Sequence, residues 1–498
     1  MTEPTTATAT ATVPDNTKTY QRNERLGPLA RFILRLRWKL AQPLQARIPL
    51  TDISVGEIFL GCPILLLLVG GISTSFVEKD VSGSGGMAAL ALVGTFLTAS
   101  KANSLFLFFL GIPFERMIHY HGMFAILSVL LGCFHGYVAY SYKAETQEEQ
   151  AAYSPHAEWG SDPDIGRFLF FPQEGYVGQI NQAGTILTIC MSLLLVTSMI
   201  EVLRRKFFDL WLATHIVASV GVIVFSVMHK SNTILVVALW WLIDLSIRYV
   251  YKSMLLFPKQ ATLQLVQEDV VQVTFSKPSK LNYTAGQYVQ VCFPSISMTQ
   301  FHAITISSAP HQDEMTLHIR ALGGWSTSLV EHVKQQTNEA GKETLTTSIR
   351  LEGPYGSMGI DLENEEKYQM VLLASGGIGV TPCLSVGKML LYQQEEQGRP
   401  MEHMHFVWAV PTLDMAQSIP PPQPQDGINV MTTDVHVTRS KLPVDEETTT
   451  RPDHNYAVHE GRPDWDKILA RLKTQAQDKS LSRVAIIACG PNSMMEEI

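Results

Sequence analysis

The chain has few charged residues for its size. Asp, Glu, Lys and Arg make up 17% of its 498 residues, whereas soluble domains carry roughly 25%. The deficit is concentrated in the first half, where long apolar runs take their place. This excludes a wholly soluble protein and indicates an integral membrane portion followed by a soluble one. The net charge of −8 does not suggest nucleic-acid binding.

Cysteine is also scarce. The six cysteines have no metal-ligand spacing: Cys62, Cys133, Cys190, Cys292, Cys383 and Cys489. The first three of them lie in apolar runs. This pattern argues against a disulfide framework. The Thr-rich, polar start has no cleavable signal peptide, and we find no internal repeat.

The N-terminal segment divides into two parts. Residues 1–20 are expected to be disordered, whereas residues 21–49 mix basic and apolar side chains. The second part is typical of an amphipathic helix on an anionic membrane surface. A mitochondrial transit peptide is the weaker alternative, because Glu3, Asp15 and Glu24 are out of character for one.

Six apolar runs can each cross a hydrocarbon core, which needs about 20 helical residues. They lie near residues 55–77, 87–111, 116–140, 179–202, 208–229 and 233–252. Basic connections fall on one side of the predicted membrane, and an acidic loop at 141–178 falls on the other. The positive-inside rule therefore places the N-terminus and everything after residue 252 in the cytosol.

Four histidines in these runs form two pairs with the same spacing. His121 and His135 lie in the third run, and His215 and His229 lie in the fifth. Fourteen helical residues complete about four turns less ~40° and climb ~21 Å, so both members of a pair share one helix face. Two such helices, predicted to be parallel, would offer two stacked His–His clamps, which suit two haems. The alternative is four unrelated histidines that bond backbone carbonyls.

Other residues near the clamps are less decisive. His119 is rotated ~160° from His135 on a helical wheel, so we exclude it as a ligand. Lys101 and Arg116 are candidates to pair with haem propionates, and snorkelling to lipid headgroups is equally open. Three glycines next to the proposed ligands would let a flat macrocycle approach the backbone, or would serve helix packing: Gly122, Gly132 and Gly136.

After residue 252 the pattern changes. Residues 261–355 alternate apolar and polar side chains between Gly and Pro, which is typical of an antiparallel β-barrel. From residue 366 a buried strand at 369–374 runs into a glycine loop and a helix, an α/β pattern. Residues 411–460 contain a Pro/Gln stretch and an acidic Thr-rich stretch, and we expect most of them to form a surface insertion.

Motifs in the barrel segment carry a family resemblance. The runs 286–288, 301–308 and 353–356 look like the flavin barrel of the ferredoxin-reductase superfamily. With the paired histidines upstream, the chain from about residue 50 resembles the ferric reductase and NADPH oxidase family. The resemblance implies that His302, Thr305 and Ser307 lie along FAD, with Thr305 near its reactive edge. The family usually has Pro and an aromatic residue at positions 303 and 304, where this chain has Ala and Ile.

A second FAD element is similar to the family's pyrophosphate motif. Its candidate residues are Arg320, Gly323, Gly324, Trp325 and Ser326. An arginine and glycine-exposed amides suit a pyrophosphate. An ordinary strand and turn is the alternative for this motif taken alone.

The α/β segment carries candidate nicotinamide residues. A glycine loop that follows a buried strand and opens a helix favours a phosphate, and its candidates are Gly376, Gly377, Gly379, Thr381 and Pro382. By resemblance, Cys489, Gly490 and Pro491 lie near the nicotinamide, and Arg462 helps to hold the adenosine 2′-phosphate. A guanidinium forks well onto phosphate, but a solvated loop charge is an equal alternative for Arg462. Because the resemblance implies this role for Arg462, we expect NADPH in preference to NADH.

The fold expected is a membrane all-α six-helix bundle, followed by an antiparallel β-barrel FAD domain and an α/β Rossmann-like NAD(P)-binding domain. The expected bounds are 1–50 for a basic, disordered cytosolic segment, 51–252 for the haem-binding bundle, 258–358 for the FAD domain and 366–498 for the NAD(P)-binding domain. Relatives usually continue with another helix and strand, so the last domain is expected to be C-terminally incomplete.

The function expected is that of a plasma-membrane ferric reductase. Electrons from cytosolic NADPH would pass through FAD and two b-type haems to ferric or cupric ions outside, with Thr305 and Cys489 at the hydride-transfer site. A superoxide-generating NADPH oxidase is the nearest rival. The connection around residues 230–232 is too short for a large external cap, and calcium-binding loops are absent from the sequence. A histidine-lined proton channel is a remote alternative.

Overall fold

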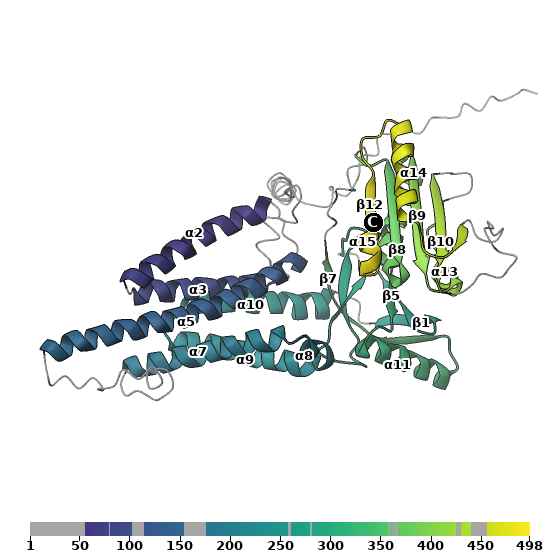
Figure 1. Ribbon diagram of the computed structural model, residues 1–498. Helices are drawn as coiled ribbons and strands as arrows, with labels where there is room; N and C mark the ends of the chain where they lie inside the picture. Colours follow the sequence, from purple (N-terminus) through teal and green to yellow (C-terminus); the bar gives the residue numbers. More distant parts are fainter. Residues whose placement is uncertain are drawn as a thin grey trace, which may run out of the picture.

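The protein combines a bundle of long helices with two lobes that contain sheets. The computed structural model describes residues 55–78, 80–101, 114–153, 176–256, 260–278, 281–356, 358, 360, 362, 367–424, 430–439 and 456–498. The helices lie side by side, and both lobes are attached at one end of the bundle (Figure 1). The basic segment predicted at 21–49 lies outside the described residues.

Five helices in the described part of the chain are long and apolar enough to cross a membrane. Their apolar spans are Val81–Thr98, Arg116–Ser141, Ile180–Met199, Phe208–Met228 and Thr233–Tyr251. The helices that contain them are α3 (Val81–Thr98), α5 (Phe114–Tyr153), α7 (Tyr176–Met199), α9 (Phe208–Met228) and α10 (Thr233–Leu245), which continues into the π-helix η2 (Ser246–Leu256). Many large apolar side chains on these helices point outward, as a lipid-facing surface requires.

Two shorter features complete the bundle. Helix α2 (Val55–Glu78) coincides with the first predicted span, but its apolar part, Ile64–Glu78, is shorter than the other spans. The short helix α8 (Glu201–Lys206) carries the basic cluster between the fourth and fifth predicted spans. The interior of the bundle is apolar and includes Leu92, Leu187 and Val222.

The predicted acidic loop is partly wrong. We expected a loop from residue 141, whereas α5 remains helical to Tyr153. Residues 142–153 are rich in Ala, Glu and Gln, which are good helix formers. The polar composition that suggested a loop therefore also allows a helix that extends past its apolar span. Residues 154–175 lie outside the described part of the chain.

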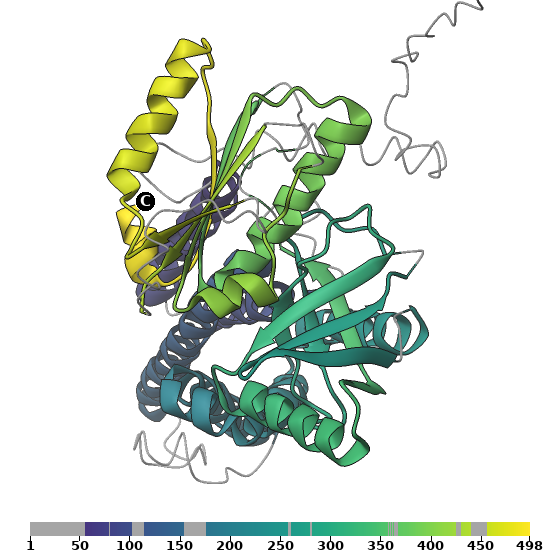
Figure 2. The same ribbon diagram turned by 90° about the vertical axis from the view of Figure 1, so that its right-hand side faces the viewer.

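The first lobe contains two antiparallel sheets. Its elements are β1 (Gln260–Gln267), β2 (Val270–Ser276), β3 (Tyr288–Cys292), β4 (His302–Thr305), β5 (Glu314–Arg320), α11 (Gly324–Ala340), β6 (Thr344–Ser348) and β7 (Arg350–Tyr355). The sheet orders are β5-β2-β1-β6 and β4-β3-β7. Alternate residues such as Val273, Leu317 and Leu351 face one shared core, so the two sheets pack as one unit (Figure 2).

The second lobe is an α/β unit with a parallel sheet. Its elements are β8 (Met370–Gly376), η3 (Gly377–Gly379), α12 (Val380–Gln397), β9 (His403–Val410), α13 (Leu413–Ser418), β10 (Met431–Val437), β11 (Ala457–Glu460), α14 (Trp465–Asp478), β12 (Ala485–Cys489) and α15 (Asn492–Glu497). The order is β11-β10-β9-β8-β12. Strand β8 is buried along its whole length, because it lies inside the sheet with helices on both faces.

The prediction of a surface insertion at 411–460 is wrong for two segments. Residues Met431–Val437 form β10, which pairs with β9, and Ala457–Glu460 form β11. The burial of β10 alternates, with Val435 buried and Asp434 and His436 on the other face. Polar residues on that face masked the period of two that marks a strand.

The buried strand β8 supplies a direct test of the fold. Leu373 is fully buried in the core between the sheet and α12. Leu373→Ala should lower the free energy of unfolding by about 2–5 kcal/mol, because it leaves a cavity. Thermal unfolding of the purified full chain, followed by flavin release, measures the loss. Ile486→Ala on the neighbouring strand, where the side chain is partly exposed, should cost much less; equal losses would contradict this packing.

Candidate functional site

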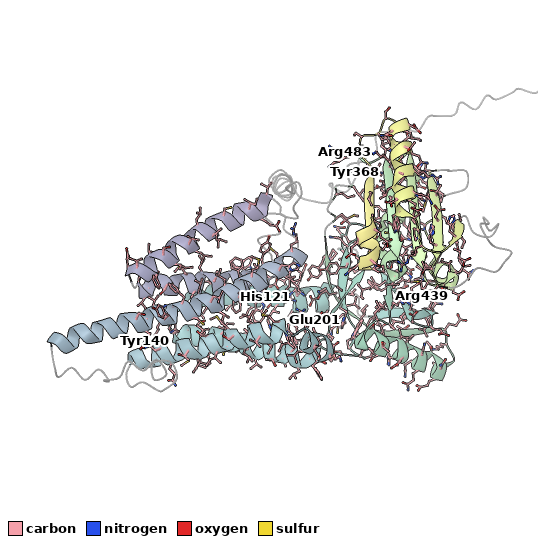
Figure 3. The ribbon with its side chains drawn as sticks, in the orientation of Figure 1. His121, Tyr140, Glu201, Tyr368, Arg439 and Arg483 are labelled. Carbon is pink, nitrogen blue, oxygen red and sulfur yellow. The ribbon has the colours of Figure 1, made fainter. Side chains whose placement is uncertain are left out.

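The structure brings the four membrane histidines together in the two predicted pairs. The ring centroids of His121 and His215 lie 6.4 Å apart, and those of His135 and His229 lie 5.7 Å apart. His121 lies toward the end of the bundle that meets the lobes, whereas Tyr140 on the same helix lies toward the far end (Figure 3). The two pairs therefore form two levels along α5 and α9.

Each pair has the separation that a shared metal ion requires. An ion about 2.0–2.1 Å from each imidazole nitrogen would place the ring centroids roughly 6 Å apart. No group of three or more His, Cys, Asp or Glu that could hold a metal is found among the described residues. Each pair is thus a two-ligand arrangement, which suits a metal whose other ligands come from a planar macrocycle.

Hydrogen bonds at Nδ1 fix the orientation of the imidazoles. His121 Nδ1 donates to the carbonyl oxygen of Thr95 over 2.9 Å, and His229 Nδ1 donates to that of Ile180 over 2.8 Å. Carbonyl oxygens only accept, so Nε2 of both rings is unprotonated and available as a ligand. Such outer bonds set the tautomer of metal-binding histidines.

The other two histidines bond to serines. Ser84 Oγ donates to the Val81 carbonyl, and it therefore accepts from His135 Nδ1 at 3.0 Å. His215 Nδ1 lies 3.4 Å from Ser198 Oγ, a longer contact. All four rings thus have a partner at Nδ1. The partners could not be identified from the sequence, because they come from other helices.

Glycines near the clamps have different roles. A Cβ at Gly184 would lie 2.7 Å from the ring of His229, and one at Gly85 would lie 3.0 Å from that of His135. Sequence reasoning missed both. Of the predicted glycines, Gly132 packs near Met191, whereas a Cβ at Gly122 or Gly136 would meet no atom within 4 Å. The last two positions border open space.

The two candidate propionate partners have protein partners. Arg116 Nε lies 3.1 Å from Glu57 Oε1. Lys101 Nζ donates to Gln290 Oε1 over 3.2 Å. Neither contact was among the alternatives that the sequence suggested. His119, which we excluded as a ligand, is exposed on the surface of α5.

The predicted flavin residues gather around β4. His302 stacks on Trp325 with ring centroids 4.0 Å apart, which joins the first FAD motif to the start of α11. Thr305, at the end of β4, is opposite Tyr288 of β3. Burial lowers the pKa of His302. Ala303 and Ile304 carry no aromatic ring, whereas His302 on the same strand is stacked on one.

Ser307 leads to a residue that the sequence did not single out. Its Oγ donates to the Thr316 carbonyl and accepts from Nδ1 of His318 at 2.8 Å. Burial lowers the pKa of His318 to about 4, and nearby Lys388 contributes. The folded state therefore contains the neutral form of His318. This residue belongs to the first lobe, which carries the predicted flavin residues and is called the flavin lobe below.

The predicted pyrophosphate element opens α11. The amides of Leu322 and Gly323 donate to Ser326 Oγ, so these two are not free for a phosphate. The next amides, in the first turn of α11, have no partner within the helix. Arg320 Nε bonds Asp269 over 2.7 Å, which leaves its terminal nitrogens for an anion. A Cβ at Gly377 would lie 3.8 Å from one of them.

The glycine loop and the Cys-Gly-Pro motif lie against each other. A Cβ at Gly379 would lie 2.5 Å from the Cys489 carbonyl oxygen, and one at Gly376 would lie 2.7 Å from Pro491. Gly377 has φ +54, and Trp408 donates from Nε1 to its carbonyl over 2.9 Å. Glycine is therefore required at position 379 for the close approach of two backbones, at 376 for the contact with Pro491, and at 377 for the positive φ.

The remaining candidates surround the same loop. Thr381 and Pro382 lie in the first turn of α12, and burial raises the pKa of the Cys489 thiol. Gly490 packs on Gly376. Arg462 follows β11 and is largely exposed, with its nearest acidic partner, Glu497, 3.9 Å away. Such an exposed guanidinium suits a ligand phosphate and equally suits solvent.

The depressed pKa of His318 predicts acid sensitivity. Its folded pKa of about 4 lies below the ordinary value of roughly 6.5, so its contribution to stability is present above pH 6.5 and is lost as pH falls toward 4. The slope should approach about 1.4 kcal/mol per pH unit. Thermal unfolding of the full chain between pH 7 and 4 measures it. His318→Gln should flatten the dependence of unfolding free energy on pH, and the control His332→Gln should not. An unchanged slope in His318→Gln would contradict the assignment of this acid sensitivity to His318.

Comparisons with known proteins agree with this arrangement. Residues 84–226 match the ferric reductase like transmembrane component, residues 255–359 match an FAD-binding domain, and residues 368–420 and 415–498 match the ferric reductase NAD binding domain. The last two matches cover the two lobes. The transmembrane match covers three of the four membrane histidines and ends just before His229.

Relatives are found over most of the chain. Human Dual oxidase 1 is 22% identical over 470 residues, which cover 86% of this chain and 29% of the relative. Dual oxidase of Drosophila melanogaster is 23% identical over 427 residues, which cover 78% of this chain and 26% of the relative. The chain thus spans less than a third of the length of these relatives. A ferredoxin NADP+ reductase structure from Neisseria gonorrhoeae, with bound FAD and NADP, is similar over 48% of this chain and 87% of its own, with 14% identity and a TM-score of 0.34.

Proposed function

We propose a function from the premise that this chain belongs to the ferric reductase and NADPH oxidase family. It is an integral membrane protein with FAD-binding and NAD(P)-binding domains. We propose that it is an NADPH-dependent oxidoreductase that moves electrons from the cytosol, through FAD and two b-type haems, to ferric or cupric ions on the far side of the membrane. When bound, FAD converts hydride transfer into single-electron transfer, and the haems carry single electrons across the bilayer.

The paired histidines are the observation that carries this proposal. His121 with His215 would hold the inner haem, and His135 with His229 the outer one, because the ring centroids of each pair lie about as far apart as two imidazole ligands of one iron. The Nδ1 bonds to Thr95 and other partners would keep the rings in this orientation. Two histidines at each level would supply both protein ligands of such an iron, so the haems would serve to pass electrons and not to bind oxygen.

The orientation follows from charge. Helix α8, with the basic cluster Arg204–Lys206, lies at the end of the bundle that carries the lobes (Figure 1). The positive-inside rule then supports a cytosolic location for both lobes and both termini. We propose a plasma-membrane protein with a six-helix bundle, in which α2 is the first span, and a flavin lobe whose two sheets form the predicted barrel.

The roles of the cytosolic residues follow from the contacts described above. His302, Thr305 and Ser307 would bind the flavin ring, with Thr305 at its reactive edge. Cys489 would lie beside the nicotinamide, because the glycine loop that would bind the pyrophosphate packs on it. Thr305 and Cys489 would together align the two rings for hydride transfer.

The anion sites would be formed by backbone amides and guanidinium groups. The FAD pyrophosphate would be held by the Arg320 guanidinium and the amides of Gly324, Trp325 and Ser326. Gly323, whose own amide bonds Ser326 Oγ, would cap the helix that presents them. The nicotinamide cofactor would be held by Gly376, Gly377, Gly379, Thr381, Pro382, Gly490 and Pro491. Exposed Arg462 would select NADPH over NADH by binding the 2′-phosphate.

A superoxide-generating oxidase is the second candidate, and the Dual oxidase relatives favour it. The connection between α9 and α10 argues against an oxidase, since α9 ends at Met228 and α10 begins at Thr233. This connection is too short to cover the outer haem and confine oxygen there. So short a connection suits a metal chelate that accepts an electron by contact.

Haem loss in a histidine variant tests the electron route. In an anaerobic difference spectrum of purified membranes, NADPH should produce a b-type haem band. In His135→Ala only the inner haem's contribution to this band should remain, and in His119→Ala the contributions of both haems should remain. A band that is unchanged in His135→Ala would contradict the ligand assignment. The absence of any haem band would favour the proton channel.

The acceptor requires a separate test. With NADPH supplied on the cytosolic side, sealed vesicles should reduce a ferric chelate on the other side under anaerobic conditions. In air, superoxide dismutase should leave most of that rate intact. A rate that superoxide dismutase abolishes, with no anaerobic reduction of the chelate, would identify the oxidase instead.

A further inference from the structure

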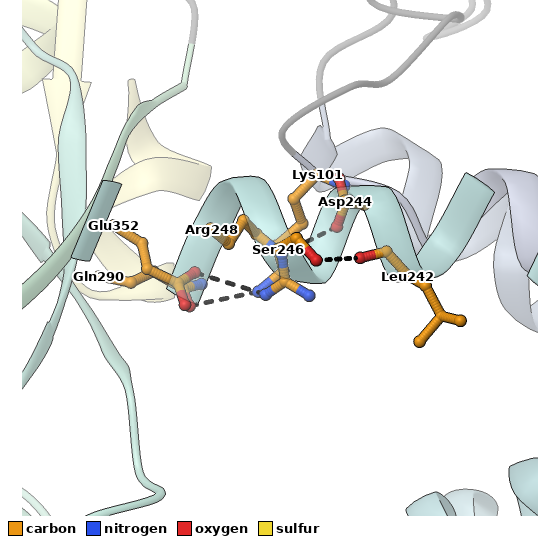
Figure 4. Close-up of polar contacts among 7 residues, drawn as sticks. All are labelled: Lys101, Leu242, Asp244, Ser246, Arg248, Gln290 and Glu352. Atoms are coloured by element: carbon orange, nitrogen blue, oxygen red, sulfur yellow. Dashed lines mark hydrogen bonds and ion pairs between the residues drawn. The ribbon is translucent and has the colours of Figure 1, made fainter. Parts of the chain in front are cut away.

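Buried charges join the membrane bundle to the flavin lobe. Asp244 of α10 is fully buried, and its two oxygens accept from Arg248 Nε over 2.8 Å and from the Lys101 amide over 3.0 Å. Arg248 Nη1 reaches Glu352 Oε2 of β7 over 3.4 Å. Arg248 thus bridges one carboxylate of the membrane bundle and one of the flavin lobe (Figure 4).

The flavin-lobe end of this bridge lies beside the flavin motif. In the sheet β4-β3-β7, Gln290 is opposite Glu352 on one side and Ala303 on the other. Gln290 also accepts from Lys101 Nζ at 3.2 Å. Both lobe residues that the bundle holds are therefore within one or two strands of the run His302–Thr305.

The bundle end lies close to the inner clamp. Lys101 is six residues after Thr95, whose carbonyl holds His121. On α9, Asp209 is six residues, or about 9 Å of helix, before His215. Asp209 accepts from Thr299 and Gln300 over 3.2 and 3.0 Å, and Gln300 in turn contacts His302. Two separate sets of contacts thus connect the bundle to the flavin lobe. One runs from α10 and Lys101 to β7 and β3, and the other runs from α9, which carries His215, to the residues just before β4.

We propose that Arg248 is a positioning residue that, with Glu352 as its partner, holds the flavin lobe at a fixed distance from the inner histidine clamp. This inference rests on the proposed electron route. Electron transfer falls steeply with the distance between donor and acceptor, so loss of the bridge slows transfer from flavin to haem. Reduction of the flavin by NADPH takes place between the two lobes and does not depend on the bridge.

The chemistry of the bridge suits this role. Glu352 and Arg248 are almost fully buried, and Glu352 Oε1 has no hydrogen-bond partner among the described residues. Buried ion pairs add little net stability, but removing one partner leaves an uncompensated charge. Glu352→Gln avoids this problem, because Arg248 keeps Asp244 as its counter-ion. The variant removes the charge that links the two domains and keeps the size of the side chain.

The experiment is anaerobic stopped-flow reduction of the full-length protein by NADPH, with flavin bleaching and the haem band recorded in the same trace. In Glu352→Gln, flavin reduction should stay within about twofold of the unaltered protein. Haem reduction should slow severalfold, because electron transfer falls exponentially with the distance between flavin and haem. Glu314→Gln, an exposed carboxylate on β5 of the same lobe, is the matched control and should leave both rates unchanged.

The outcomes separate the inference from the proposed function. Equal rates in Glu352→Gln and the unaltered protein, or an equal slowing of both steps, overturn the positioning role and leave the electron route intact. Failure of NADPH to reduce any haem in the unaltered protein overturns both. If Glu352→Gln loses a cofactor, Asp209→Asn at the exposed second contact replaces it. There too, selective slowing of haem reduction supports the proposal and unchanged rates overturn it.

Discussion

The hydrogen bond at Nδ1 of each membrane imidazole is the interaction on which the proposed electron route depends. Two of these bonds end on backbone carbonyls, those of Thr95 and Ile180, so the tautomer is set by groups that cannot donate. Nε2 is then left unprotonated in these two rings, and the rings of each pair lie 6.4 and 5.7 Å apart. The partners come from α3 and α7, so the packing of the whole bundle determines the geometry of the clamps.

The same helices also fix the position of the cytosolic lobes. Asp244 and Arg248 are buried at the end of the bundle, in a segment where an unpaired charge costs several kcal/mol. Their partner Glu352 belongs to the flavin lobe, so the membrane and cytosolic parts share one buried set of charges. The wider turns of the π-helix η2 contain Arg248, and such helical irregularities are frequent at functional sites.

Sequence patterns predicted the elements with strong periodicity and missed those defined by contact. The spacing of His121, His135, His215 and His229 predicted both ring pairs, because a helix makes residues 14 apart share a face. The buried strand and glycine loop at 370–379 were also predicted correctly, because a short apolar run followed by glycines is a local sequence signal. Ser84, Gly184 and His318 were missed, since each acts on a residue far away in the chain. Strand β10 was missed because Thr, Asp and His occupy its polar face. The roles of the candidate cofactor residues remain predictions.

The haem-to-flavin ratio of the purified full chain, together with the electron paramagnetic resonance spectrum of the oxidised protein, tests the central claim most directly. Two bis-histidine clamps predict two low-spin haems for each FAD, neither of which binds carbon monoxide after reduction. A ratio of one, or a high-spin haem that binds carbon monoxide, would mean that at least one histidine pair does not hold an iron between its rings. That result would contradict a two-haem path across the membrane.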